Sequence, residues 1–204
     1  MAFKYFRGNP LVKCGFIVEG DSEIIVFKSK NINDIFYDND LECVGIYSAQ
    51  GRENIIKPNG EVESKVKILL DKGAEVIFII MDLEKDDCLV NLKISCHEYY
   101  SKQYIIILVQ ALETWFLADS ITLSSILKKN FYYEEPEKTP ELPYEVIKKE
   151  FMNSFNGRGP GSKVSLSRKM IREGFSFENI LQHPNCKSAK YFYSKLKSLK
   201  NNSE

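Results

Sequence analysis

The segment Glu75–Met81, with the sequence EVIFIIM, constrains the fold of this 204-residue chain more than any other segment. It is a continuous apolar run rich in β-branched residues, which is typical of a central strand covered by helices on both faces. Amphipathic stretches separate it from three further apolar runs, which are Leu11–Val18, Cys43–Ser48 and Gln103–Val109. This alternation predicts an α/β fold with a mainly parallel four-stranded sheet flanked by helices.

Apolar residues at helical spacing fill the intervals between these strands. Asp21 or Ser22 can cap a helix after the first strand, and a polar loop follows the second strand. The remaining helices of this part are expected at residues 61–72, 87–100 and 112–129, the last as one long or two short helices.

The acidic stretch Tyr133–Glu145 contains three prolines and predicts a surface linker, because proline lacks the backbone N–H that regular elements require. Three more helical patterns follow it, at Tyr144–Asn153, Lys163–Glu173 and Ser188–Lys200. We therefore expect an α/β domain in residues 1–130. Residues 131–204 are expected to form a proline-containing linker and a helical C-terminal extension packed on that domain.

The charge balance limits the partners of the chain. Lys plus Arg and Asp plus Glu both number 28, so bulk attraction to polyanions is excluded and a nucleic-acid contact needs a local basic patch. The apolar runs are far shorter than the roughly 20 residues of a membrane span, and there is no signal-peptide core, so a cytoplasmic protein without membrane contact is expected. Five cysteines without a C-x-x-C pair, and only two histidines, favour reduced thiols over a zinc site or disulfides.

Acidic residues gather where two of the predicted strands end. The first strand is followed by EGDSE at residues 19–23, and the third by DLEKDD at residues 82–87. Ligands of open parallel sheets bind at the carboxyl ends of the strands. If the chain stays extended after the third strand, Asp82 and Glu84 present their carboxylates to one side. Two or three such carboxylates suit Mg²⁺ or Mn²⁺, and phosphoryl transfer is the matching chemistry.

A purely structural role explains only some of these carboxylates. Glu19 and Asp82 each directly follow an apolar run, so they bring a charge close to the sheet without a structural gain. Helix capping and the helix dipole account more readily for four others, which are Asp21, Glu23, Asp86 and Asp87.

The two strand ends together resemble the TOPRIM domain of topoisomerases, bacterial primases, recombination-repair proteins and OLD-type nucleases. FIVEGDSE at residues 16–23 is similar to the strand-Glu-Gly-x-Ser/Thr-Glu signature of that family, and IIMDLE at residues 79–84 to its strand-Asp-x-Asp signature. QGRENI at residues 50–55 looks like its Gly-Lys-x-Asn segment. The resemblance covers residues 11–110 and implies a TOPRIM-like, Rossmann-like sheet.

Two later motifs narrow the resemblance. ALETWFLAD at residues 111–119 and GSK at residues 161–163 are similar to a small family of bacterial TOPRIM proteins, some tied to phage defence. The resemblance implies that Glu19 is a general acid/base or metal-linked residue, and that Asp82 and Glu84 bind Mg²⁺, with Asp86 as a further candidate ligand. Glu84 stands where the common signature has Asp, and the residues after it lack the glycine often found there. The longer side chain can still reach a metal, but it changes the geometry.

Basic residues supply candidate phosphate contacts. Arg52 can offer paired donors to a phosphate from the loop after the second strand, although an arginine in such a loop is more often simply solvated. Lys163 opens a predicted helix after a glycine-rich loop, which is a second candidate anion site. With Arg158 and the bases of residues 168–172, it forms the local basic patch that the neutral net charge requires.

Further residues with polar or aromatic side chains are Glu113, Trp115, His97 and His183. Glu113 comes soon after the fourth predicted strand and is a candidate for the same catalytic edge, as is Glu23. Trp115 is interpreted as a core residue. His97 and His183 lack the neighbours that a nucleophilic triad requires.

The sequence therefore favours a metal-dependent nuclease that cleaves DNA or RNA with Glu19, Asp82 and Glu84. The family resemblance suggests a bacterial anti-phage effector, with an ATPase partner or self-association as candidate assemblies. The length leaves little room for the DNA-gripping domains of a topoisomerase, and a primase normally needs a zinc region. One alternative is a catalytically silent TOPRIM module that binds nucleic acid or a partner. Another is a receiver-like domain in which Asp82 accepts a phosphoryl group. Receivers have a lysine after a fifth strand, and the sequence shows no fifth strand with that lysine.

Overall fold

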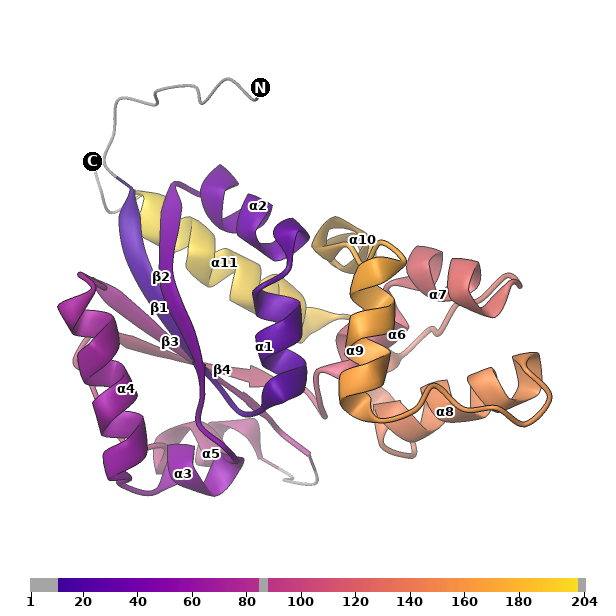
Figure 1. Ribbon diagram of the computed structural model, residues 1–204, viewed down its shortest axis with the longest axis horizontal. Coiled ribbons are helices and arrows are strands. Elements are labelled where there is room, and N and C mark those ends of the chain that lie inside the picture. Colours follow the sequence, from indigo (N-terminus) through magenta and orange to yellow (C-terminus); the bar gives the residue numbers. More distant parts are fainter. Residues whose placement is uncertain (1–10, 85–87, 202–204) are drawn as a thin grey trace.

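The computed structural model describes residues 11–84 and 88–201. Its centre is a four-stranded, all-parallel sheet in the order β2-β1-β3-β4 (Figure 1). The predicted α/β fold, the parallel sheet and the helical C-terminal region are therefore confirmed. The strands are β1 (Val12–Val18), β2 (Leu41–Ser48), β3 (Val76–Asp82) and β4 (Gln103–Leu108).

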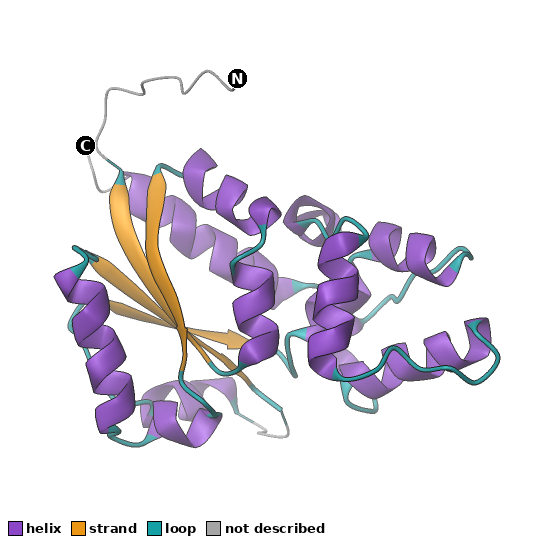
Figure 2. Ribbon diagram, in the orientation of Figure 1, coloured by secondary structure: helices purple, strands orange, loops and turns teal. Residues whose placement is uncertain are grey.

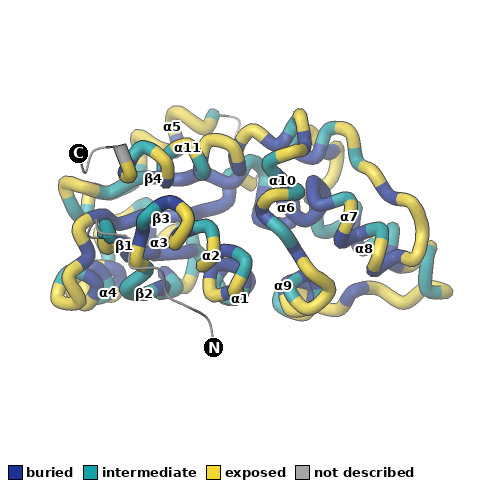
Figure 3. Tube along the Cα trace, turned by 90° about the horizontal axis from the view of Figure 1, so that it is seen from above, coloured by how far each residue is buried: buried dark blue, intermediate teal, exposed yellow. Residues whose placement is uncertain are grey.

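Strand β3 is buried along its whole length, as its continuous apolar sequence predicts (Figure 3). Successive side chains point to opposite faces of a strand, so each face of the sheet has its own apolar cluster. Phe16, Phe78 and Ile106 belong to one cluster, whereas Ile17 and Ile79 belong to the other. Both faces therefore need a layer of helices.

Helices cover the two faces separately (Figure 1). The cluster around Ile17 is closed by α3 (Arg52–Ile56), α4 (Gly60–Asp71) and α5 (Leu89–Ser95). The cluster around Phe16 is closed by α1 (Asp21–Phe27), α2 (Lys30–Asp38) and the last helix, α11 (Lys187–Asn201). No helix within residues 11–84 and 88–201 combines the length and apolarity needed to cross a bilayer.

The region between β4 and α11 contains helices and loops only (Figure 2). Its helix α9 packs along α1, near the end of the sheet at which α1 begins. The elements of this region are α6 (Glu113–Ala118), α7 (Ser120–Leu127), the 3₁₀ turn η1 (Pro136–Lys138), α8 (Pro143–Ser154), α9 (Lys163–Arg172) and α10 (Phe177–Gln182).

Several predicted boundaries were wrong. The helix expected at 87–100 is the shorter α5, and the polar loop after β2 contains α3. The segment 112–129, by contrast, forms two short helices, which is one of the two arrangements expected; they meet at Asp119, whose carboxylate accepts hydrogen bonds from the backbone N–H groups of Thr122 and Ser176. The predicted linker is partly buried, since Pro136 and Thr139 pack inside. Short helices such as α10 are set by tertiary contacts, which periodicity does not reveal.

Trp115 is a core residue, as predicted, and is fully buried. Its ring packs against Phe27, Phe177 and Phe192, so it joins α1, α10 and α11. The indole Nε1–H donates a hydrogen bond to Ser188 Oγ at 3.2 Å. This bond satisfies a donor that the surrounding apolar core would otherwise leave without a partner.

We expect Ser188→Ala to lower the free energy of unfolding by about 1 kcal/mol, because the buried indole N–H loses its acceptor. Urea denaturation monitored by tryptophan fluorescence measures this change. Ser194→Ala is the matched control, since Ser194 is exposed on the same helix. A cost no greater than that of the control would show that the bond to Ser188 does not stabilise the core.

Candidate active site

The candidate site lies where the neighbouring strands β1 and β3 end. Glu19 directly follows β1, and Asp82 is the last residue of β3. The two positions are linked directly, because the backbone N–H of Asp82 donates a hydrogen bond to Glu19 Oε2 at 3.1 Å. Burial raises the pKa of Glu19, although this hydrogen bond acts to lower it. The charges of Glu23 and Glu84 raise the pKa further.

Asp82 is 6% exposed, and its Oδ1 accepts a hydrogen bond from the backbone N–H of Leu112 at 3.0 Å. The carboxylate thus holds the start of α6 against the end of β3. Burial raises the pKa of Asp82 well above its usual value, and the charges of Glu23, Glu113 and Glu19 add to this effect. Four carboxylates therefore interact at this edge of the sheet.

Glu23 lies in the first turn of α1 and is buried. Its Oε2 accepts a hydrogen bond from the backbone N–H of Gly20 at 2.9 Å. Gly20, rather than Asp21 or Ser22, is the N-cap residue of this helix. Burial raises the pKa of Glu23, and the charge of Glu113 contributes in the same direction. The capping role proposed for Glu23 is therefore present, but its carboxylate also faces the acidic cluster.

Glu113 is the first residue of α6 and is only 1% exposed. Neither of its carboxylate oxygens accepts a hydrogen bond from the described residues. Lys163 Nζ lies 3.5 Å from Glu113 Oε2 and forms an ion pair across the gap between α9 and α6. Burial raises the pKa of Glu113 in spite of this pair. A buried carboxylate without hydrogen bonds is costly and calls for a further positive partner.

Lys163 is the first residue of α9, and its side chain is half exposed. Burial alone would lower the pKa of this ammonium group, but the charges of Glu113, Asp82 and Glu23 outweigh burial and raise it. The predicted basic residue thus lies within the acidic cluster, whereas the sequence suggested a free anion site. We refer to Glu19, Glu23, Asp82, Glu113 and Lys163 together as the charged cluster.

Glu84 departs from the expected geometry. The strand ends at Asp82, and Glu84 has a left-handed backbone with φ 52°, so the two carboxylates do not share a side through strand alternation. The half-exposed Glu84 side chain lies 3.8 Å from Arg52 Nη1, which also donates a hydrogen bond to the Leu83 carbonyl at 3.4 Å. Arg52 therefore contacts the loop after β3 directly.

Backbone strain accumulates at this edge. Gln50, Glu84 and Gln110 have φ values of 58°, 52° and 62°, and each is the second residue after its strand. A left-handed conformation costs roughly 1–2 kcal/mol in residues other than glycine. The loops are also tied together, since the N–H of Glu84 donates to the Gln110 carbonyl at 2.7 Å. Such strain is typical of functional edges, and Gln110 was not singled out from the sequence.

Arg158 is not part of the charged cluster. Arg158 lines a cavity of about 560 Å³ together with Phe151, Phe155 and Lys169. Asp86 lies outside the described residues.

Within residues 11–84 and 88–201, no three His, Cys, Asp or Glu side chains are gathered closely enough to ligate one metal ion. The donor chemistry nevertheless fits a divalent cation. Among the residues that the structure describes, four interacting carboxylates are accompanied by the Lys163 ammonium group, and the oxygens of the buried Glu113 accept no hydrogen bond. Carboxylate oxygens are the ligands that Mg²⁺ and Mn²⁺ prefer.

Comparisons of this chain with protein-family models, with curated proteins and with solved structures found no match. Its function must therefore be inferred from the chemistry of the charged cluster.

Proposed function

We propose that this chain is a metal-dependent nuclease of TOPRIM type, which hydrolyses phosphodiester bonds in DNA or RNA. One observation carries the proposal: two carboxylates with raised pKa values, the half-buried Glu19 and the buried Asp82, lie at the carboxyl ends of two adjacent parallel strands, with the Lys163 ammonium group close to the cluster they belong to. Perturbed carboxylates of this kind are typical of catalytic sites. Their position also obeys the rule for ligand binding in open parallel sheets.

Glu19, Asp82 and Glu84 would hold Mg²⁺ or Mn²⁺, with Asp86, Glu23 and Glu113 as further candidate ligands. When bound, the cation would neutralise charge on the scissile phosphate and lower the pKa of a water molecule. Glu19 has one oxygen engaged by the Asp82 amide, so its second oxygen can hold a proton. Burial raises its pKa above the usual carboxyl value, which favours that role.

The substrate side of the site would be basic. Lys163 is half exposed beside the acidic cluster, where its ammonium can contact a phosphate oxygen of a bound strand. Arg52 has its guanidinium beside the loop after β3. Arg158, on the loop before α9, would extend the phosphate contacts away from the reacting bond.

The biological setting of the proposal comes from the resemblance to small bacterial TOPRIM proteins. We propose a cytoplasmic anti-phage effector, acting with a partner ATPase or as a homo-oligomer. Residues 1–130 would form the catalytic α/β domain, and residues 131–204 would supply Lys163 and Arg158 from the helical extension.

We expect the chain to cleave nucleic acid only with Mg²⁺ or Mn²⁺, and Glu19→Gln to reduce the rate by at least about tenfold, because Gln cannot hold the proton or the metal charge. Labelled single- and double-stranded DNA and RNA, assayed with each metal and with EDTA, measure this. Glu53→Gln is the control, because Glu53 is exposed on α3 and forms an ion pair with Lys57. Cleavage that persists in Glu19→Gln, or in EDTA, would refute the proposed site.

A catalytically silent module is the second candidate function. Two observations favour it: Lys163 already supplies a positive charge within the cluster, and Glu84 lies beside Arg52 instead of sharing a side with Asp82. Such a module would bind nucleic acid in EDTA as tightly as in Mg²⁺ and would cut none of the substrates. Binding and cleavage measured on the same samples separate the two functions.

A further inference from the structure

Strand β4 is an edge strand with free hydrogen-bonding groups. Within the described part of the chain, it pairs with β3 alone. The carbonyls of Lys102 and Leu108 accept hydrogen bonds from the β3 side, at 3.1 Å and 2.9 Å. Alternate residues of a parallel strand direct their backbone groups to opposite sides. The N–H and C=O groups of Ile105 and Ile107 therefore face outward, away from β3.

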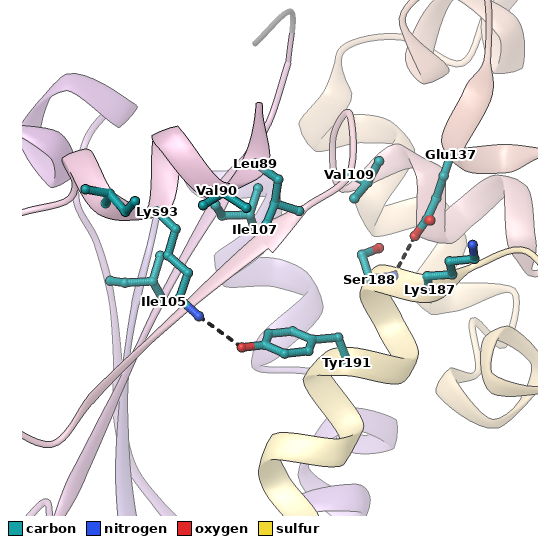
Figure 4. A pocket seen from close by; sticks show the side chains of 11 residues that line it. Leu89, Val90, Lys93, Ile105, Ile107, Val109, Glu137, Lys187, Ser188 and Tyr191 are labelled. Carbon is teal, nitrogen blue, oxygen red and sulfur yellow. Dashed lines mark hydrogen bonds between the residues drawn. The ribbon is translucent and has the colours of Figure 1, made fainter. Parts of the chain in front are cut away.

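A groove runs along this edge, between α5 and α11 (Figure 4). It encloses about 650 Å³ and is lined mainly by apolar side chains. Ile105 and Ile107 of β4 lie at its floor, and Tyr191 of α11 lies across from α5. Helix α5 contributes Val90 and Ile94, which are 59% and 77% exposed. We call this feature the β4 groove.

Apolar exposure on α5 is unusual for so short a helix. Leu92 packs into the core, yet Leu89, Val90 and Ile94 all remain exposed. Contiguous exposed apolar surface beside a groove marks an interaction site more often than a bare solvent face. The two features together, an open strand edge and an apolar wall beside it, suit the addition of an extended segment.

Lysines outnumber carboxylates along the β4 groove, since Lys93, Lys187 and Lys195 line it and its continuation together with Glu137 and Glu98. Lys93 Nζ donates a hydrogen bond to Tyr191 OH at 3.1 Å and lies 5.5 Å from the centre of that ring. Lys195 Nζ lies 5.2 Å from the same ring. Neither lysine forms an ion pair with a carboxylate of the described residues. A second cavity of about 390 Å³ shares Lys93, Ile105 and Tyr191 and continues the groove toward Gln103.

We propose that the β4 groove binds an extended segment of another protein, which adds to the sheet as a fifth strand and carries apolar residues alternating with an acidic residue. The outward N–H and C=O groups of Ile105 and Ile107 pair with the backbone of that segment. Its apolar side chains pack on Ile94 and Val90. Its carboxylate lies beside Lys93 and Lys195, which form no ion pair with a carboxylate of the described residues.

Charge also argues against two other occupants. The β4 sequence, QYIIIL, has no acidic residue, so pairing of β4 with β4 of a second copy would bring Lys93 and Lys195 of the two copies together without adding a carboxylate from the strand itself. The first ten residues of this chain, MAFKYFRGNP, carry a lysine and an arginine and no acidic residue. The excess of lysines along the groove therefore favours a separate, acidic partner.

Selection from a displayed library of random twelve-residue peptides, with the full chain as bait, tests this proposal. We expect enriched peptides to alternate apolar and acidic residues. Synthetic versions should bind at least about tenfold more weakly to Ile94→Glu and to Lys93→Glu, because each change places a negative charge in the groove. Ile121→Glu is the matched control, since Ile121 is 65% exposed on α7 and outside the groove.

Amide hydrogen exchange on the peptide complex tests the mode of binding. Strand addition slows exchange at Ile105 and Ile107, whereas a helix docked on α5 leaves these amides unchanged and would overturn the fifth-strand proposal. No enriched peptide, enrichment of basic peptides, or equal binding to Ile94→Glu and Ile121→Glu would also overturn it. Sedimentation of the free chain measures its oligomeric state. If the chain is a dimer and Ile94→Glu dissociates it, a second copy occupies the groove and the proposal is overturned.

Discussion

Replacing Asp82 by Asn is expected to reduce metal-dependent cleavage by more than about 100-fold while leaving the fold intact. Changes to groups that only support metal ligands typically cost 10–100-fold, and a direct ligand should exceed that range. The amide oxygen of Asn can still accept the hydrogen bond that the Leu112 N–H gives to Asp82 Oδ1. Single-turnover cleavage at increasing Mg²⁺ concentrations measures the loss.

The same substitution should stabilise the metal-free protein. Burial and three neighbouring carboxylates raise the pKa of Asp82, so its ionised form is less favourable in the folded chain than in the unfolded chain. A neutral Asn removes that cost, and the melting temperature in EDTA should rise. Lower activity with higher stability is the signature of a functional carboxylate. Cleavage within about threefold of wild type, or a fall in melting temperature to match that of a core mutation, would contradict the assignment.

The sheet was predictable because of how its strands are buried. Strand β3 is covered on both faces, so its sequence is continuously apolar, and the same property marks β1 and β4. The positions of Glu19 and Asp82 follow from these strands, since each acidic residue comes at a strand end. Glu113 was a candidate for the same reason.

Two features of the site could not be predicted from local sequence. Lys163 pairs with Glu113 from 50 residues further along the chain, because α9 packs along α1 and so reaches the end of the sheet. Glu84 adopts a left-handed backbone because its N–H bonds to the Gln110 carbonyl in the loop after β4. Both depend on tertiary contacts that neither periodicity nor motif spacing reports.

Replacing Lys163 by Met is expected to lower the free energy of unfolding at pH 8, without divalent metal, by about 2 kcal/mol. Removing one partner of a buried ion pair typically costs 3–5 kcal/mol, and the half-exposed Lys163 side chain reduces this value through solvent screening. Lys148→Met is the matched control: Lys148 is 42% exposed, but its partner Glu145 is equally exposed. The control should change stability by less than about 0.5 kcal/mol.

The loss of unfolding free energy caused by Lys163→Met should depend on pH, and the carboxylates of the charged cluster determine the direction of this dependence. The pKa values of Glu19, Glu23, Asp82 and Glu113 are raised in the folded chain, so the folded state binds more protons than the unfolded state above pH 4–5, the usual pKa range of carboxyl groups. Stability from this cluster therefore falls as pH rises through the raised pKa values. His183, whose pKa burial lowers, acts in the opposite direction near pH 6.5, but equally in wild type and variant.

Lys163 offsets the carboxylate charge, so its loss should matter most at pH 8 and little near pH 5, where the carboxyl groups take up protons. Chemical denaturation of both proteins at the two pH values gives the difference. Mg²⁺ should restore part of the loss at pH 8, and adding Glu113→Gln to Lys163→Met should recover more than half of it, because the buried charge is then absent. An equal loss of unfolding free energy in Lys163→Met at pH 5 and pH 8, with no recovery on adding Glu113→Gln, would be the opposite result. It would mean that Lys163 stabilises α9 by packing alone.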